Sequence, residues 1–197
     1  MWSSIIPTAP EGISVDDFFT NFVPEQFSQM KEILNAVDLS FLAGKDFNMQ
    51  FNVEGKEYGI KFKNGNDLEI INGAVDKPAV AFYVSEKDWR DAVTGKFNKM
   101  ADDFSGDPSS FIDTKRYSAL QSTNGTVNMN LKKNDGGTLP LKVVFNGVET
   151  PAVTVNLDMV DGLAMLNKAT NGMDLFTKGK LKFEGDMVLL MKLQNLF

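Results

Sequence analysis

The chain of 197 residues contains no cysteine and no histidine. It therefore forms no disulfide and carries neither a thiolate nucleophile nor the side chain most used for proton transfer near neutral pH. The usual zinc sites and the serine–histidine–aspartate triad are excluded as well. Calcium binding and carboxylate-only catalysis stay open, but no nucleophile–base pair or phosphate-binding loop stands out. We expect a protein that is not an enzyme and that holds neither a metal nor a cofactor.

Positive charge is also scarce. The chain has 20 lysine and arginine residues against 26 aspartate and glutamate residues, a net charge of -6. This balance argues against a nucleic-acid partner. The first residues lack the basic start of a signal peptide, and the longest apolar runs, such as Ala79–Val84, are too short to span a bilayer. We expect a cytoplasmic protein, and the sequence does not determine its oligomeric state.

Tyrosine and tryptophan are few, whereas phenylalanine and methionine are abundant. The chain has three tyrosines and two tryptophans beside 16 phenylalanines and 10 methionines. Phenylalanine and methionine carry no hydrogen-bonding group and provide large, adaptable apolar surface. This composition suits either a lipid-sized cavity or an ordinary phenylalanine-rich core, and it leaves both open.

Apolar and polar residues alternate in several short segments, as they do in half-buried strands. Pro78–Val84 is apolar throughout, which is typical of a central strand. Strands are predicted at residues 47–53, 58–62, 68–71, 78–84, 127–131, 139–145, 151–157 and 180–184. Helices are predicted at 14–22 and 27–37, interrupted by Pro24, and at 86–93, 111–120, 159–166, 173–176 and 187–197.

The closing stretch combines two periodicities. Lys180–Glu184 alternates as a strand does, and Asp186 can cap a helix that begins at Met187. This helix, Met187–Phe197, is apolar on nearly all sides. Such a helix does not belong on an ordinary solvated surface. It must be covered by the protein, covered by a partner, or line a site for apolar cargo.

Short sequence matches recur between the two halves of the chain. Asn48-Met49 recurs as Asn128-Met129, Asn64-Gly65 as Asn146-Gly147, and Pro78-Ala79-Val80 as Pro151-Ala152-Val153. The matches indicate a partial internal duplication of a β-β-β-α unit, in which the second copy lacks the strand at 68–71. Chance resemblance between two such stretches is the alternative.

The two copies are expected to share one sheet. We therefore predict a single elaborated domain, residues 1–197. Its predicted parts are a leader at 1–13, a first repeat unit at 47–97, a connector at 98–125, and a second repeat unit with the closing strand and helix at 126–197.

The residues of the closing stretch resemble a known family. Lys178–Gln194 reads KGKLKFEGDMVLLMKLQ and is similar to the closing signature of the sterol carrier protein type 2 family, roughly GKLKxxG[ND]MGLAMKLQ. Asp16–Phe19, Pro78–Lys96 and Asn171–Phe176 also resemble members of this family. The resemblance covers most of residues 14–97 and 126–197 and leaves the connector without a counterpart.

The resemblance implies an α+β fold, in which a twisted, mainly antiparallel sheet and its helices enclose an apolar tunnel. Members of the family bind sterols, fatty acyl chains or other long apolar molecules without performing chemistry, and the closing helix lines the tunnel. This chain has Val188 and Leu190 where the family pattern has glycine and alanine. If both side chains point inward, the tunnel is narrower, and a single acyl or isoprenoid chain fits better than a sterol.

The predicted function is intracellular binding and transfer of an apolar lipid, either fatty acyl, isoprenoid or sterol-like. Gln194 would meet a polar headgroup or be solvated, and for each other predicted residue packing in an ordinary core is the alternative to ligand contact. The predicted lipid-binding residues are Trp89, Val93, Leu163, Leu166, Phe176, Val188, Leu189, Leu190, Leu193, Gln194 and Phe197.

A second hypothesis is an accessory or scaffold protein that presents a lipid-tailed intermediate to a partner enzyme or membrane. Residues 159–197 carry five lysines (168, 178, 180, 182 and 192) against four acids (161, 174, 184 and 186), a net charge of about +1, whereas the rest of an acidic chain carries about -7. This difference favours transient contact with an anionic membrane, and a mixed solvated surface is the alternative.

Overall fold

The chain folds around one mixed β-sheet. The structure is a computed structural model that describes residues 8–34, 44–64, 67–97, 114–166, 169–194 and 196. The sheet has eight strands in the order β3-β2-β1-β4-β6-β5-β7-β8. The pairs β1–β4 and β5–β7 are parallel, and the other neighbouring strands are antiparallel. This confirms the predicted α+β class with a mainly antiparallel sheet.

The strands lie where the alternating patterns predict them. The first half contributes β1 (Asp46–Val53), β2 (Lys56–Lys63), β3 (Asp67–Asn72) and β4 (Val80–Val84). The second half contributes β5 (Gly125–Lys132), β6 (Thr138–Phe145), β7 (Ala152–Asp158) and β8 (Lys182–Gly185). β4 pairs with β1 on one side and β6 on the other, as expected of its apolar sequence.

The helices precede, separate and follow the strands along the chain. Their bounds are α1 (Val15–Asp17), the π-helical η1 (Phe18–Phe22), α2 (Val23–Leu34), α3 (Glu86–Val93), α4 (Thr114–Ser122), α5 (Met159–Leu166), α6 (Gly172–Thr177) and α7 (Met187–Leu193). Ser85 caps α3 by accepting a hydrogen bond from the Asp88 amide, and Asp186 caps α7 through the Leu189 amide at 2.7 Å. Both helix starts agree with the sequence pattern.

Two predicted helix boundaries are wrong. Pro24 does not interrupt the first helix, because the wider π turn directly before it bonds the Val23 amide to the Phe18 carbonyl and relieves the clash that proline causes in a regular turn. α7 ends at Leu193, where the Leu196 amide bonds back to the Leu193 carbonyl and tightens the turn. The predicted continuation of α2 to Val37, and Phe197 itself, lie outside the described residues.

The two halves of the sheet share one strand arrangement. In each half a hairpin is followed by a strand parallel to the first hairpin strand, giving β2-β1-β4 and β6-β5-β7, and then by a helix, α3 or α5. In the first half the additional strand β3 lies between the hairpin and the parallel strand along the chain. The matched sequences do not share a register, however. Met49 lies opposite Val80, whereas Met129 lies opposite Val155 and the matched Val153 lies opposite Val127. A common origin of the two units therefore stays a prediction.

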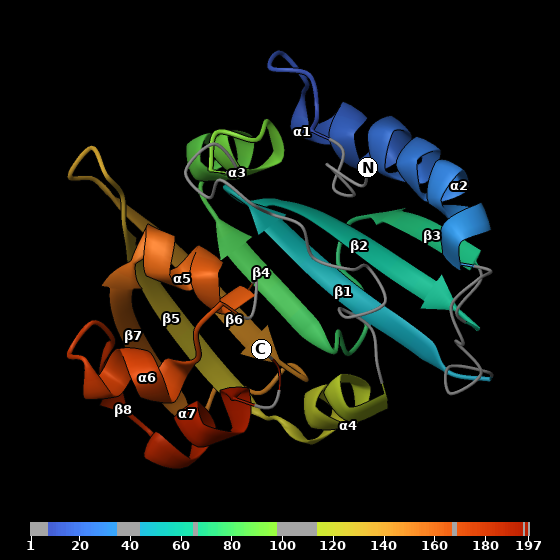
Figure 1. Cartoon of the computed structure of the whole chain (residues 1–197). Helices are drawn as coiled ribbons and strands as arrows, with labels where there is room; N and C mark the ends of the chain where they lie inside the picture. The colour runs from blue at the N-terminus through green and yellow to red at the C-terminus, as the bar shows by residue number, and fades with distance from the viewer. Residues whose placement is uncertain are drawn as a thin grey trace.

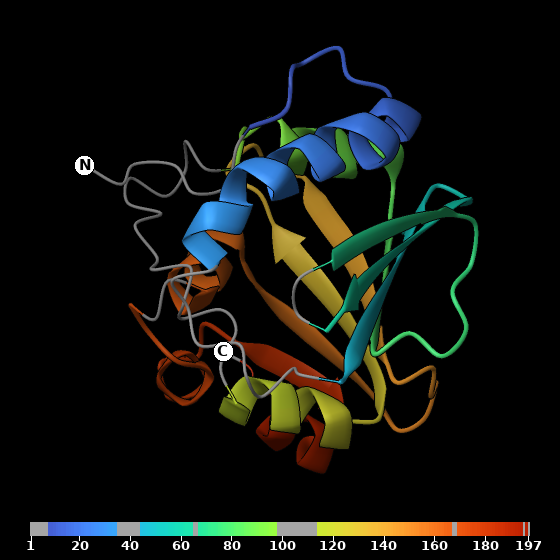
Figure 2. The ribbon, with the colours of Figure 1, turned by 90° about the vertical axis from the view of Figure 1, so that its right-hand side faces the viewer.

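One face of the sheet, here called the inner face, is apolar across all strands. The register aligns apolar side chains on this face in an unbroken row. From β2 to β7 the row runs Tyr58, Phe51, Phe82, Val143, Val127 and Val153. Helices α1, α2 and α3 gather at one end of the sheet, and α4 and α7 lie at the opposite end (Figures 1 and 2).

The inner face carries two hydrophobic clusters, one beneath each group of helices. The first joins Phe19 and Trp89 of the N-terminal helical group to Val53, Tyr58 and Ile60. The second joins buried residues of β4–β7 to Leu175, Leu181, Leu189 and Leu193. The centre of the sheet lies between these two covered ends.

Candidate functional site

The candidate site is a strip of half-buried apolar side chains on the central strands. These side chains belong to the inner face, and together they connect the two hydrophobic clusters. We call them the inner-face strip: Phe47, Met49 and Phe51 of β1, Phe82 of β4, Met129 of β5 and Leu141 of β6. Side chains on central strands are normally covered completely when they serve only as core.

The aromatic rings of the strip are ordered by contact with one another. The rings of Phe51 and Phe82 stack with centroids 5.1 Å apart, and Phe51 also meets Phe19 at 5.2 Å. Phe19 in turn stacks on Tyr58 at 4.5 Å. The first cluster therefore extends as a continuous aromatic surface from the N-terminal helices to the middle of the sheet.

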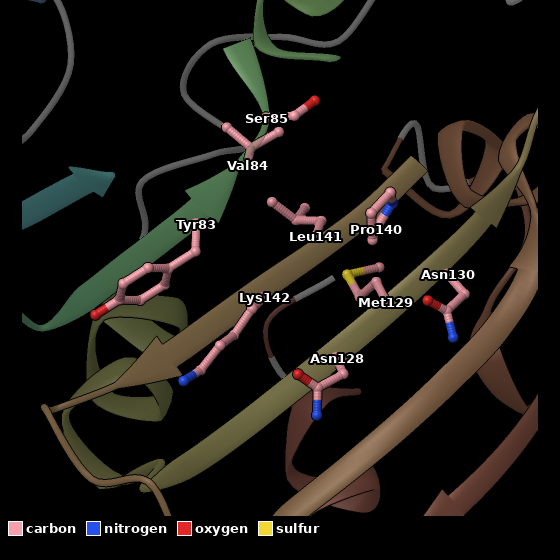
Figure 3. Close-up of a pocket in the computed structure, with 9 residues that line it drawn as sticks. All are labelled: Tyr83, Val84, Ser85, Asn128, Met129, Asn130, Pro140, Leu141 and Lys142. Atoms are coloured by element: carbon pink, nitrogen blue, oxygen red, sulfur yellow. The ribbon is translucent and has the colours of Figure 1, made fainter. Parts of the chain in front are cut away.

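The sheet opens at one end of the strip. β4 and β6 pair only from Val80–Phe145 to Tyr83–Lys142, and beyond this point the two strands diverge. The fork contains an open hollow of about 350 Å³ (Figure 3). Its lining residues are Tyr83, Val84, Ser85, Asn128, Met129, Asn130, Pro140, Leu141 and Lys142.

The lining of the fork hollow is apolar on one side and polar on the other. Met129 and Leu141 belong to both the hollow and the inner-face strip. Asn128 and Lys142 lie opposite each other in the register and belong to the outer face of the sheet. The hollow therefore brings polar groups to the margin of the apolar strip.

The positive charge of Lys142 at the hollow is balanced by an ion pair with Glu149. Lys142 pairs with Glu149 at 2.9 Å, and its ammonium lies 5.1 Å from the centre of the Tyr83 ring. The hydrogen bond from Lys142 is the main reason that the pKa of the Glu149 carboxyl falls below its usual value, and the Thr126 hydroxyl adds to the effect. These contacts hold the Lys142 ammonium in place at the rim of the hollow.

The predicted lipid-binding residues fall into separate regions. Leu189 and Leu193 are buried in the second cluster, and Leu190 packs against it half-buried. Trp89 and Val93 belong to the first cluster, where the Trp89 ring meets Phe18 edge-on at 5.2 Å. The structure therefore does not bring the predicted set together into one lining.

The remaining predicted residues lie mostly outside the core. Phe176 is 46% exposed and Val188 is 64% exposed. Gln194 is exposed, and Leu163 is half-buried. The Leu166 side chain and Phe197 lie outside what the structure describes.

The exposure of Val188 bears on the width of any internal space. Asp186 fixes the start of α7, and Leu189 is only 1% exposed in the core beneath it. Val188 therefore points away from the sheet, and its extra carbons do not narrow a space under α7. Of the two larger side chains, only Leu190 adds volume toward the second cluster, so only Leu190 favours a slender acyl or isoprenoid chain over a sterol.

Sequence reasoning missed the inner-face strip as a site. The alternating pattern predicted a strand at residues 47–53, but its apolar side chains were not proposed as part of a binding site. The excess of phenylalanine and methionine pointed to these side chains, since most of the strip consists of those two residue types.

Two further properties of the described residues bear on function. No helix among them is long and apolar enough to cross a membrane. Across the same ranges, no three acidic side chains are grouped so that they could hold a metal ion.

Comparison with known proteins relates the second half of the chain to one family. The model of the SCP-2 sterol transfer family matches residues 110–197, which include α4 and all the elements from β5 to α7. Residues 14–97, to which the predicted resemblance also extends, lie outside this match. No curated protein matches the chain.

Solved structures of sterol carrier proteins are also similar. Sterol carrier protein 2 like 2 from Aedes aegypti is 23% identical, with a TM-score of 0.31, over 51% of this chain and 88% of its own. Sterol carrier protein 2 from Yarrowia lipolytica is 19% identical, with a TM-score of 0.35, over 53% and 87%. Domain 2 of the Helicoverpa armigera protein is 23% identical, with a TM-score of 0.36, over 53% and 84%.

All three TM-scores lie below 0.5, so the sequence match carries the relationship. The match includes the closing strand and helix, β8 and α7, where the predicted family signature lies. The part of this chain that is similar to the SCP-2 sterol transfer family is therefore residues 110–197, and it contains the closing motif that resembles that family.

Proposed function

We propose that this chain binds the apolar tail of a long-chain lipid on the inner face of its sheet and transfers the lipid without chemical change. The observation that carries the proposal is the inner-face strip, which keeps large apolar side chains half-buried in the middle of a sheet. The match of residues 110–197 to a sterol transfer family supports the same function.

The strip offers enough apolar surface for useful affinity. Burial of one CH₂ group contributes roughly 0.8 kcal/mol, so a sixteen-carbon tail gains on the order of 10 kcal/mol before ordering costs are subtracted. Phenylalanine and methionine adapt to tails of different shape, since methionine is flexible and aromatic rings contact a tail through a broad face. Fatty acyl, isoprenoid and sterol-like tails are therefore all candidates.

The fork hollow gives the proposed ligand a route from solvent. Met129 and Leu141 line the hollow and also belong to the strip, so a tail on the strip would reach solvent between β4 and β6. The amide of Asn128 and the ammonium of Lys142 stand at the same opening and suit a polar headgroup (Figure 3).

The test is titration of the purified chain with a fluorescent fatty acid, comparing two variants that place glutamine at half-buried apolar strand positions. Leu141→Gln changes the inner-face strip, whereas Ile71→Gln changes the opposite face of the sheet. We expect about tenfold weaker binding for Leu141→Gln, because the amide is desolvated without a partner, and unchanged binding for Ile71→Gln. Equal affinities for both folded variants, or no binding by the unmodified chain, would refute the proposal.

A further inference from the structure

The C-terminal helices expose large apolar side chains on the side away from the sheet. Among the described residues, all of the exposed large apolar side chains except Val160 belong to α6 or α7. We define these as the docking face: Met173 (52% exposed) and Phe176 (46%) of α6, and Met187 (50%), Val188 (64%) and Met191 (55%) of α7. A patch of exposed apolar side chains on a helix surface indicates a site of contact with a membrane or a partner protein.

The packing of α7 prevents this surface from turning inward. Leu189 and Leu193, one turn apart, are buried in the second cluster. Met187, Val188 and Met191 lie on the other side of the same helix, as the 3.6-residue period requires. The Asp186 cap fixes the first turn, so burying the exposed side would expose the buried one.

The packing of α6 follows the same rule. Leu175 is 2% exposed beneath the helix, whereas Met173 and Phe176 project outward. The Phe176 ring also meets Phe183 of β8 with centroids 5.6 Å apart, which holds it in place at the edge of the cluster. Both helices pack on the second cluster, so their exposed sides point away from the inner face together.

Unpaired positive charge accompanies the docking face. Lys192 lies in the last turn of α7, four residues after Val188 and therefore on the same side of the helix. Lys178 ends α6. Neither lysine has an ion-pair partner in the part of the chain described, whereas Lys180 pairs with Asp161 at 2.8 Å.

The nearby acids occupy structural positions. Asp174 bonds to Asn171 at the start of α6, and Asp186 caps α7. Glu184 alternates with Phe183 on β8 and therefore lies on the outer face of the sheet, away from the two helices. Asp174 lies four residues before Lys178 and therefore on the same side of α6, so among the described residues Lys192 is the lysine of the docking face without an acidic neighbour on its side of the helix.

From this combination we infer that the docking face binds the surface of an anionic lipid bilayer. Apolar side chains enter the interface, and lysines beside them reach the headgroups with their long stems. A second copy of the chain fits less well, because a two-fold contact would place the same lysines close to their own copies. The inference goes beyond the proposed lipid binding and does not depend on it.

The test is sedimentation of the full chain with vesicles of phosphatidylcholine, with and without phosphatidylserine. Val188→Glu places a charge on the docking face. Val160→Glu is the matched control, because Val160 is also exposed (41%) and is also the second residue of its helix, α5. Glutamate in a first turn suits the helix dipole, so both variants should fold.

We expect the unmodified chain to sediment with the phosphatidylserine vesicles. Val188→Glu should reduce the partition coefficient about tenfold, and Val160→Glu should leave it unchanged. Lys192→Gln should weaken binding about fivefold on phosphatidylserine vesicles only, and the difference should shrink at high salt.

Two results would overturn the inference. One is the absence of sedimentation with either kind of vesicle. The other is a dimer in solution that Val188→Glu dissociates, which would assign the docking face to a second copy. Titration of Val188→Glu with the fluorescent fatty acid separates the two proposals, because lipid-tail binding should remain even when vesicle binding is lost.

Discussion

Lys133 and Asp88 form a buried ion pair across the fork in the sheet. The lysine ammonium lies 2.5 Å from the aspartate carboxylate, and each side chain is only 9% exposed. Lys133 directly follows β5, whereas Asp88 lies in the first turn of α3, where it also accepts a hydrogen bond from the Ser85 hydroxyl. The pair therefore joins the two halves of the chain where β4 and β6 separate.

Removing the lysine charge should destabilise the fold strongly. Lys133→Met leaves the Asp88 carboxylate buried without its cation, which should cost about 3 kcal/mol in the free energy of unfolding measured with urea. Lys142→Met is the control, because the Lys142–Glu149 pair is exposed and worth less than about 1 kcal/mol. If both variants lose the same small amount, the buried pair does not hold the halves together.

The raised pKa of the Tyr58 hydroxyl means that the fold should lose stability at high pH. Burial, followed by the hydrogen bond that the hydroxyl donates to Asp16, raises the pKa of Tyr58 from 10.0 to about 12. The folded state therefore holds this proton more tightly than the unfolded state. The resulting stabilisation is complete below pH 10 and is lost as the pH rises toward 12.

Between these pH values the free energy of unfolding should fall by roughly 2 kcal/mol because of Tyr58. The measurement is urea unfolding of the unmodified chain and of Tyr58→Phe at a series of alkaline pH values. Other tyrosines and lysines titrate in both proteins, so the difference between the two isolates Tyr58. Identical pH dependence in the two proteins would contradict the assignment.

Gly125 should be intolerant of any side chain, because α7 packs directly on it. A Cβ atom there would lie 2.4 Å from the Pro151 carbonyl oxygen and 2.9 Å from a Leu189 methyl group. Gly73 is the matched control, since its φ of 131° is close to the 129° of Gly125 and a Cβ atom there would contact nothing within 4 Å.

Gly73→Ala therefore reports the backbone strain alone, about 1 kcal/mol. Gly125→Ala should cost about 2 kcal/mol more, from the contacts with Pro151 and Leu189. Thermal unfolding of the two variants gives this difference. Equal melting temperatures would mean that the Pro151 backbone and α7 both move aside without cost, and that the packing around Gly125 is not tight as described.

The local structure could largely be predicted from sequence. The alternation around Phe47–Val53 predicts β1, and the Asp186 cap predicts the start of α7, because each signal depends on neighbouring residues. Pro24 shows where local sequence signals fail. Proline normally ends a helix, but here the π turn directly before Pro24 allows the helix to continue through it.

The site could not be predicted in the same way. The pairing of β4 with β6 joins residues distant in sequence, and this pairing places Phe82 opposite Val143 and creates the fork beyond Tyr83 and Lys142. Val188 shows a second limit: a helix that is apolar on nearly all sides does not reveal which side is buried. The closing motif pointed to the family whose model matches residues 110–197, but only the fold shows which side of α7 is exposed and which is buried.

The central claim, that a lipid tail lies on the inner face of the sheet, is tested most directly by photo-crosslinking. The chain is loaded with a fatty acid that carries a diazirine in its tail, irradiated, digested and mapped by mass spectrometry. The account predicts adducts on the peptides that contain Phe47–Phe51, Phe82 and Met129. Adducts confined to the outer face of the sheet or to the exposed side of α7, or no adduct at all, would contradict it.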